Sequence, residues 1–429
     1  PSLLLNLDLA TQHVPAESEI LAHVSDPNPT ILRATDFGAP TSPTGAPSDW
    51  NLAADAVFRI AHEVRRSARA TGQTPRLFIT GRAGLPLFVQ LGCLLSARVL
   101  EFTLLNRRKD STQWDSLHFP PPQNPTAHPD NAPFFAVRSG LNANDNPGRI
   151  AVTISTNLRR NAAAPIAFLQ KKNEPVAAEI ELRTHSLSPE APPVTFLTGE
   201  NAPKAAAELM DIFSRIPCLF PNANGLALFI DGPITLAFLA GRAIVPRISP
   251  IHNNVWIPSF SGSEYRDALR LPHKPPIPVF IVHADEDRAF AERLKNKTLA
   301  RTNTRGWHTG MLLPGDPVEE MTGRMLNEAK IILVVVSPNT YAHDDTHHLV
   351  ERALDRMQHQ NAKVIPILAR HCDWKSNLPR LGALHALPTG NQWLKSATNN
   401  DNDEQWAEVE RALRPVIDQV RADLFGEEM

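Results

Sequence analysis

The segment from Pro278 to Ser337 constrains the fold of this chain more than any other part of the sequence. Two short apolar runs, Val279–Val282 and Ile331–Val336, are separated by two stretches with the apolar spacing of amphipathic helices. Continuous apolar runs of this length are typical of strands that are buried on both faces. Because they alternate with helices, they predict a parallel α/β sheet whose ligand sites lie at the carboxyl ends of the strands.

The residues around these runs resemble a TIR domain. The resemblance covers roughly the last third of the chain and implies a flavodoxin-like fold with a central parallel sheet. It rests on features that occur in the order of that family: the acidic cluster Asp285-Glu286-Asp287, the loop residues Pro314-Gly315, the apolar run Val364–Leu368, then Cys372-Asp373-Trp374, Ala386-Leu387-Pro388 and Trp393.

The composition is that of an ordinary globular protein. The 429 residues are 42% hydrophobic and carry a net charge of −2, which predicts two or three domains and no surface that coats DNA. The three cysteines are far apart and form no CxxC pair, which indicates a reducing compartment and no structural zinc site. No apolar run approaches the ~20 residues that span a bilayer, and no signal peptide is visible. We therefore expect a cytoplasmic protein with no membrane partner.

Prolines mark the predicted domain boundary. The chain has 39 of them, and proline is excluded from helix interiors and central strands. The segment Leu271–Pro278 (LPHKPPIP) therefore indicates a short, stiff connector. We predict a first domain at residues 1–270, a linker at residues 271–277 and a second domain at residues 278–429.

The first domain contains a weak internal repeat. Leu77–Gly81 precedes an apolar run that ends at Gly92, and Leu228–Gly232 precedes a similar run that ends at Gly241. Each half reads as a strand, a glycine turn and a helix whose N-terminus offers free N–H groups to an anion. The repeat predicts a duplicated Rossmann-like domain with a ligand cleft where the two halves meet.

The second copy of the repeat is similar to SAVED domains. The match includes LFIDGPITLAFLAGRAI, VWIPSF and GSEYRDALRLP, and it covers most of residues 50–270. The resemblance implies two fused CARF-like halves that bind a cyclic oligonucleotide messenger in bacterial antiphage defence. By analogy with the family, cyclic tri-adenylate is the preferred activator. The first fifty residues carry no motif that we can interpret.

Polar groups near the ends of the predicted strands are candidates for the messenger pocket. Hydroxyl, amide and guanidinium groups suit phosphates and base edges, and an aromatic ring can stack on adenine. The candidates are Thr80, Gly81 and Arg82 in the first half, Thr156, Asn157 and Arg159 after the strand Ile150–Ser155, and Asp231, Gly232 and Trp256 in the second half. Structural interpretations stay open: the glycines suit turns, Arg159 suits a solvated strand end, and Trp256 lies in an apolar run.

The TIR resemblance implies cleavage of the nicotinamide–ribose bond of NAD⁺, as substrate and without a cofactor. This chemistry needs a carboxylate beside the ribose. In the family it is a glutamate four residues before an Ala-Leu pair, and aligning on Ala353-Leu354 puts Leu349 at that position. Glu351 lies two residues later, about 200° away around a helix. Either the helix is shifted and Glu351 serves, or Asp344 or Asp345 substitutes, or the domain is not catalytic. We predict catalysis with Glu351.

Four further residues are predicted to border NAD⁺. His283 and Ala284 end the first strand of the TIR-like part, Trp307 begins the loop to Asp316, and Ser337 ends the second apolar run. In the resembling enzymes this loop closes over the nucleotide from a neighbouring protomer. The resemblance therefore implies a homo-oligomer or filament that forms on activation.

Other functions find less support in the sequence. His343 and His347 have the i, i+4 spacing of a zinc pair, but no HExxH motif accompanies them, so we predict no metal. Neither GxSxG nor GxGxxG occurs. A TIR scaffold that only recruits another protein is the principal alternative, and the missing glutamate is its best support. An enzymatic first domain ranks last, because residues 1–270 show no nucleophile–base constellation.

Overall fold

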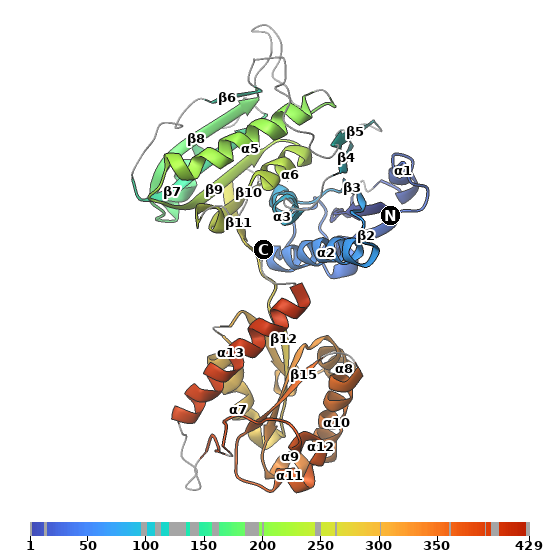
Figure 1. Ribbon diagram of the computed structural model, residues 1–429, viewed down its shortest axis with the longest axis vertical. Coiled ribbons are helices and arrows are strands. Elements are labelled where there is room, and N and C mark those ends of the chain that lie inside the picture. The colour runs from blue at the N-terminus through green and yellow to red at the C-terminus, as the bar shows by residue number, and fades with distance from the viewer. Residues whose placement is uncertain are drawn as a thin grey trace. The chain divides into compact units, whose positions relative to one another are not determined.

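The computed structural model describes residues 2–12, 15–95, 101–107, 113–119, 134–137, 146–156, 163–184, 197–199, 201–244, 250–261, 264–300, 302–359, 362–390, 392–395 and 403–425. The chain forms two compact units, Pro1–Lys274 and Pro275–Met429. The division falls within the predicted linker, and each unit has its own sheets and core (Figure 1).

The first sheet of the first unit has the strand order β2-β1-β3-β4-β5. Its first four strands in the sequence run parallel to their neighbours, and β5 is an antiparallel edge strand. The strands are β1 (Ser2–Asn6), β2 (Thr30–Arg33), β3 (Arg76–Thr80), β4 (Phe102–Arg107) and β5 (Trp114–Phe119). The helices are α1 (Glu17–Leu21), η1 (Ala34–Phe37), α2 (Trp50–Thr71) and α3 (Leu85–Leu95).

The second sheet of this unit has the order β11-β10-β9-β7-β8-β6, with parallel central strands and antiparallel edges. The strands are β6 (Phe135–Val137), β7 (Gly148–Ser155), β8 (Val176–Thr184), β9 (Ala223–Asp231), β10 (Val255–Ser261) and β11 (Glu264–Leu271). The helices are α4 (Ala164–Lys171), α5 (Ala202–Leu219), α6 (Ile234–Ala243) and η2 (Pro250–Asn253).

Helices α3 and α6 join the two halves through a contact at two glycines. A Cβ atom on Gly92 would lie 2.1 Å from the carbonyl oxygen of Phe238, and one on Gly241 would lie 2.0 Å from that of Val89. Gly92 lies three residues after Val89, and Gly241 lies three residues after Phe238, so the two helices make the same contact with each other. This pseudo-twofold arrangement confirms the predicted duplication and explains why both apolar runs contain a glycine.

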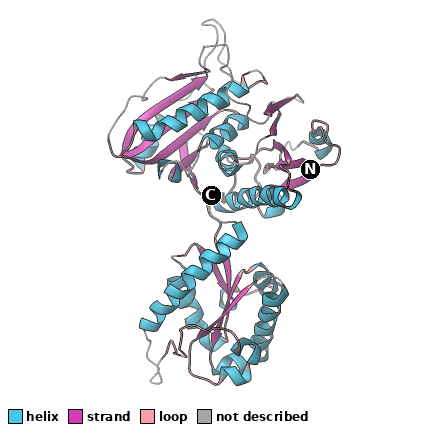
Figure 2. Ribbon diagram, in the orientation of Figure 1, coloured by secondary structure: helices cyan, strands magenta, loops and turns pink. Residues whose placement is uncertain are grey.

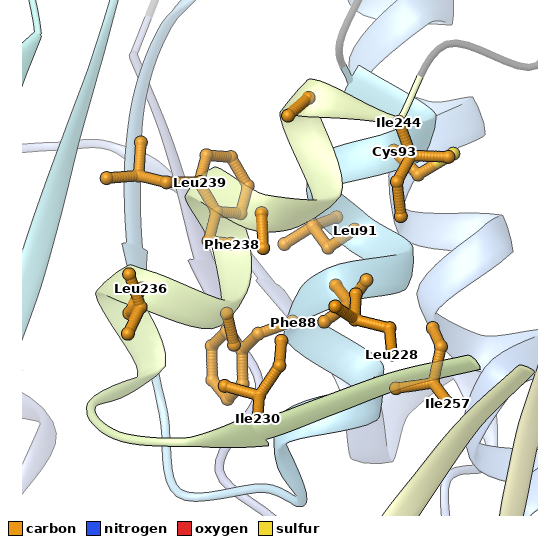
Figure 3. Close-up of a cluster of buried hydrophobic side chains, with 14 of the residues drawn as sticks. Phe88, Leu91, Cys93, Leu228, Ile230, Leu236, Phe238, Leu239, Ile244 and Ile257 are labelled. Carbon is orange, nitrogen blue, oxygen red and sulfur yellow. The ribbon is translucent and has the colours of Figure 1, made fainter. Parts of the chain in front are cut away.

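Apolar side chains fill the space around this helix pair. Figure 3 shows Phe88 and Leu91 of α3 beside Phe238 of α6, with Ile230 of β9 below them. All four are 5% exposed or less. Burial of this much apolar surface is the main stabilising contribution to such a core, and it fixes the two glycine turns at the starts of α3 and α6.

The second unit has a four-stranded parallel sheet in the order β13-β12-β14-β15. The strands are β12 (Ile277–Val282), β13 (Thr304–His308), β14 (Ile331–Val336) and β15 (Lys363–Leu368). The helices are η3 (Asp285–Asp287), α7 (Arg288–Arg293), the π-helical turn η4 (Leu294–Leu299), η5 (Thr309–Met311), α8 (Val318–Glu328), α9 (Pro338–Ala342), α10 (Asp344–His359), α11 (Trp374–Asn377), α12 (Pro379–Gly382) and α13 (Asp403–Phe425).

Helices cover both faces of this sheet (Figure 2). Ile281 and its alternate neighbours pack under α7 and α13, whereas Phe280 and Val282 pack under α8 and α10. Every residue of β14 is buried, which is why the run Ile331–Val336 shows no alternation of apolar and polar residues. The doubly covered parallel sheet confirms the fold that the apolar runs predicted.

Candidate functional site

The loop that follows β3 is held against the end of β1. Gly81 has a φ of +136°, and a Cβ atom there would lie 2.4 Å from the carbonyl carbon of Leu7. The N–H of Leu7 donates to the carbonyl oxygen of Thr80 at 2.9 Å, and that of Leu9 donates to Arg82 at 3.2 Å. Only glycine fits at position 81, because both the backbone conformation and the close approach exclude a side chain.

The end of β1 adds polar groups that sequence reasoning missed. Asp8 lies beside Arg82, and its Oδ1 accepts a hydrogen bond from the N–H of Ala10 at 3.1 Å. Burial raises the pKa of Asp8, while the N–H of Ala10 and the positive charge of Arg82 oppose that rise. The available signal was the apolar run Leu3–Leu5 followed by polar residues at alternate positions, which is typical of a strand end.

In the second half, the structure brings Thr156 to Asp231 and Gly232. Strands β7 and β9 pair so that Ser155 lies opposite Asp231. The N–H of Thr156 then donates to the carbonyl oxygen of Asp231 at 2.9 Å. A Cβ atom on Gly232 would lie 3.2 Å from Oγ1 of Thr156. The carboxyl ends of the parallel strands β7 and β9 thus bring their polar residues together, as expected for a site at this edge of a sheet.

Asn157 and Arg159 lie outside the described residues. Thr80 is 3% exposed and belongs to the first sheet, so the predicted residues form two groups, one at the end of each half's central strand.

Trp256 requires a correction. It is 2% exposed, and it lies near the start of β10, where it pairs with Ala227. Its ring contacts Phe168, with centroids 4.9 Å apart, and the guanidinium of Arg270 lies 4.3 Å from its centroid. The apolar position of Trp256 in the sequence therefore reflects the core under α4, and its ring offers no face to an adenine.

At the strand ends of the second unit, a buried acid joins three segments. Asp287 has no exposed surface. Its Oδ2 accepts a hydrogen bond from the hydroxyl of Ser337, and its Oδ1 accepts one from Arg370 at 2.6 Å. Ser337 also begins α9, where its Oγ accepts the N–H of Asn339 at 3.1 Å. The acidic cluster after β12 is thereby tied to the ends of β14 and β15.

The predicted NAD⁺ contacts differ in their accessibility. Ser337, Ala284 and His283 are 0%, 1% and 4% exposed. They therefore lie beneath the surface at the strand ends, and their contact with NAD⁺ stays a prediction. Trp307 is half-buried and stacks on Phe280 with centroids 5.3 Å apart. Of the four predicted residues, it alone retains substantial exposure.

His283 pairs with a second buried histidine. Its Nδ1 lies 2.7 Å from the carbonyl oxygen of Ala284, to which it donates, so its Nε2 is left as an acceptor. That atom lies 3.2 Å from Nδ1 of His308, which must therefore carry the proton. Burial, reinforced by the neighbouring His283, Lys295 and Arg288, lowers the pKa of His308 to about 4.

We expect this histidine pair to make the second unit sensitive to acid. The unfolded chain binds a proton at His308 with a pKa of about 6.5, whereas the folded chain resists protonation down to about 4. Stability is therefore complete above pH 6.5 and is lost as the pH falls, by about 2 kcal/mol between pH 7 and pH 5. Urea unfolding of wild type and His308→Gln at both pH values measures this loss. Equal losses in the two proteins would contradict the assignment.

Glu351 lies within α10, which runs from Asp344 to His359, and its side chain is 34% exposed. The carboxylate of Glu351 pairs with Arg380 of α12, which also binds Asp355 at 2.9 Å. Leu349 instead packs against the core.

Asp344 and Asp345 lie near the end of β12. Both are exposed at the start of α10. His343, directly before them, has its Nε2 3.1 Å from Oε1 of Glu286. Because Glu286 follows β12, this bond holds the beginning of α10 beside the end of that strand.

Among the described residues, no three His, Cys, Asp or Glu side chains gather as they would around a metal ion. No described helix combines the length and the apolar character that crossing a membrane requires.

Two family models match the chain. The model for the SMODS-associated and fused to various effectors sensor domain (SAVED) matches residues 60–252, within the first unit. A TIR domain model matches residues 279–412, within the second. Both resemblances found in the sequence are thereby confirmed.

Similar proteins include two solved structures and one further sequence. The SAVED/CARF-domain receptor Cap4 of Acinetobacter baumannii, solved with the cyclic trinucleotide 3'3'3'-cAAA, is 16% identical with a TM-score of 0.39, over 63% of this chain and 52% of the receptor. The TIR domain of the Toll-related receptor TRR-2 from Hydra magnipapillata is 19% identical with a TM-score of 0.24, over 33% of this chain and 98% of that domain. The uncharacterized protein y4lF of Sinorhizobium fredii is 29% identical over 147 residues, which are 33% of this chain and 44% of that protein. The chain thus spans about half of the receptor's length and less than half of the length of y4lF.

Proposed function

This chain belongs to the proteins that join a SAVED sensor domain to a TIR domain, and we propose on that premise that it is a TIR effector controlled by a cyclic oligonucleotide. Binding of the messenger to the first unit causes the chains to assemble, and the assembled TIR domains cleave NAD⁺ in the cytoplasm during antiphage defence. The observation that carries this proposal is the presence of both domain types in one chain.

The polar groups at the ends of β3 and β9 support the sensor role. Gly81 and Gly232 each lie between the end of a strand and a helix of the pseudo-twofold pair. A cyclic oligonucleotide has repeated phosphates and bases, so two related half-sites can contact chemically equivalent parts of one ring. Cyclic tri-adenylate is the first ligand to test, by analogy with the family. Calorimetric titration with cyclic di-, tri- and tetranucleotides measures binding, and no binding of any of them would reject the sensor role.

The proposed reaction breaks the bond between nicotinamide and C1′ of the ribose. Water supplies the oxygen that replaces nicotinamide, and one proton is released, so that NAD⁺ and water give nicotinamide, ADP-ribose and H⁺. A carboxylate near C1′ stabilises the oxocarbenium-like charge and orients the water. Asp344 and Asp345 are exposed near the end of β12, and this supports them over Glu351 as the source of that carboxylate.

The loop between β13 and α8 supports assembly as part of the mechanism. Leu313 is 70% exposed and Val318 is 61% exposed, although both are large apolar residues. Side chains of this kind favour contact with another protein surface. In the proposed assembly this loop meets a neighbouring TIR domain, so that the active site is complete only after the messenger has bound.

One observation favours a second function, that of a scaffold without catalysis. Glu351, the glutamate nearest to the family position, lies two residues from it and is paired with Arg380. In this alternative, messenger binding still assembles the TIR domains, but the assembly recruits another protein and leaves NAD⁺ intact.

Substitution of the acids separates these possibilities. We expect Asp344→Asn combined with Asp345→Asn to reduce messenger-stimulated NAD⁺ cleavage about 100-fold, because the charge that stabilises the transition state is removed. Glu351→Gln should reduce it less than about threefold, because an exposed ion pair contributes little. The measurement is NAD⁺ consumption at saturating messenger. A large loss in Glu351→Gln, with little change in the aspartate variant, would assign the reaction to Glu351 instead.

A further inference from the structure

Helix α2 buries one acidic residue on its apolar face. Asp55 is 6% exposed and lies among Ala53, Ala54, Ala56 and Val57, which are each 1% exposed or less. A carboxylate in such surroundings is costly unless it is hydrogen-bonded. Its Oδ1 lies 2.6 Å from Nε2 of His273, so the carboxylate accepts a hydrogen bond from the imidazole. We call this contact the linker anchor.

His273 lies at the root of the connector between the two units. Leu271, the last residue of β11, is 4% exposed in the core of the first unit. The first unit ends at Lys274, so the linker anchor comes directly before the chain passes to the TIR unit. The prolines in LPHKPPIP make this connector semi-rigid. When the N-terminal end of a stiff connector moves, its C-terminal end moves with it. In a flexible connector the same movement would be lost in changes of the backbone angles.

The same end of α2 that carries Asp55 also contacts the candidate messenger site. A Cβ atom on Gly84, in the loop after Gly81, would lie 2.4 Å from the ring of Trp50, the first residue of α2. Gln90 of α3 has no exposed surface, and its Nε2 donates to the carbonyl oxygen of Ala54 at 2.9 Å. The Gly81–Gly84 loop and α3 therefore both pack directly against α2. The contact from α3 is made at Ala54, the residue next to Asp55.

We propose that the linker anchor transmits messenger binding from the first unit to the TIR unit. The inference rests on the proposed function and adds its route of regulation. Binding at the Gly81–Gly84 loop displaces α2 through Trp50 and Gln90, and the Asp55–His273 bond carries that displacement into the stiff connector. Asp55 and His273 are positioning residues in this account, because neither contacts the messenger or NAD⁺.

A double-mutant cycle tests the linker anchor in the full-length chain. His273→Ala and Asp55→Ala are each expected to reduce the ratio of NAD⁺ cleavage with and without cyclic tri-adenylate at least about tenfold. The double variant should equal either single variant, because both act through one bond. Messenger affinity, measured by calorimetry, should stay within about twofold of wild type. Asp55→Asn, which keeps an acceptor oxygen, should restore most of the ratio, and Lys274→Ala in the same connector should leave it unchanged.

Hydrogen exchange at the amides of His273 and Lys274 gives a readout that needs no NAD⁺ cleavage. In wild type the messenger should change this exchange, and in Asp55→Ala the change should be absent. If the messenger changes this exchange equally in the wild type and in both alanine variants, the linker anchor is overturned and the proposed function stays intact. Wild type that binds no messenger would overturn both. A response that is lost in the alanine variants and restored in Asp55→Asn would establish it.

Discussion

Replacing Gly241 with alanine is expected to destabilise the first unit by about 3 kcal/mol, although the same change in a helix interior ordinarily stabilises by about 1 kcal/mol. The new methyl group would lie 2.0 Å from the carbonyl oxygen of Val89, which belongs to a helix backbone and cannot turn aside. Helices α3 and α6 would have to separate, and the apolar core between them would open. Gly92→Ala should have a similar effect, because the contact is the same from both sides.

The second unit provides a matched control for this prediction. Gly323 also lies within a helix, but a Cβ atom there would meet only Nη2 of Arg352, at an ordinary 3.4 Å. Gly323→Ala should therefore stabilise the second unit by up to about 1 kcal/mol. Hydrogen exchange of α6 and α8 peptides across a urea series reports on each unit separately. Stabilisation by both alanines would contradict the described contact between α3 and α6.

The second large effect is expected at Asp287. Asp287→Ala removes the acceptor for both the Ser337 hydroxyl and the Arg370 guanidinium. We expect a loss of roughly 2–3 kcal/mol, below the usual cost of breaking a buried ion pair because Arg370 is 35% exposed. The loops after β12, β14 and β15 would lose the hydrogen bonds that join them at Asp287. Because these loops surround the candidate site, NAD⁺ cleavage should fall by more than about tenfold even in folded protein.

Asp285→Asn is the control for that variant. Asp285 lies on the same turn, its side chain is 86% exposed, and it pairs with Arg288 at 3.7 Å. Its loss should cost less than about 0.5 kcal/mol. Urea unfolding of the second unit compares the two variants. Equal stability of Asp287→Ala and Asp285→Asn would show that the buried acid does not hold the strand ends together.

The elements that could be predicted from the sequence are those whose pattern is local. The run Ile331–Val336 is apolar throughout because both faces of β14 are covered, and the paired glycines at 92 and 241 follow from one repeated helix contact. The central position of β1 could not be predicted in the same way. Its partners β2 and β3 are set by pairing across the chain, and no motif in the first fifty residues indicates that pairing.

The candidate site was less predictable because its contacts join distant residues. The bond between His283 and His308 depends on the register of β12 and β13, and the Asp287–Arg370 pair spans 83 positions of the sequence. The sequence raised a doubt about Glu351, since a two-residue offset turns a helical side chain by about 200°. The partner that holds Glu351, Arg380, lies on another helix and could be identified only in the structure.

The measurement that tests the central claim most directly is NAD⁺ consumption by the purified chain with and without cyclic tri-adenylate, with messenger binding measured on the same preparation. The account predicts that NAD⁺ is stable in the absence of the messenger and is converted to nicotinamide and ADP-ribose in its presence. Protein that binds the messenger and assembles, yet leaves NAD⁺ intact, would contradict the enzymatic claim and establish the scaffold function in its place.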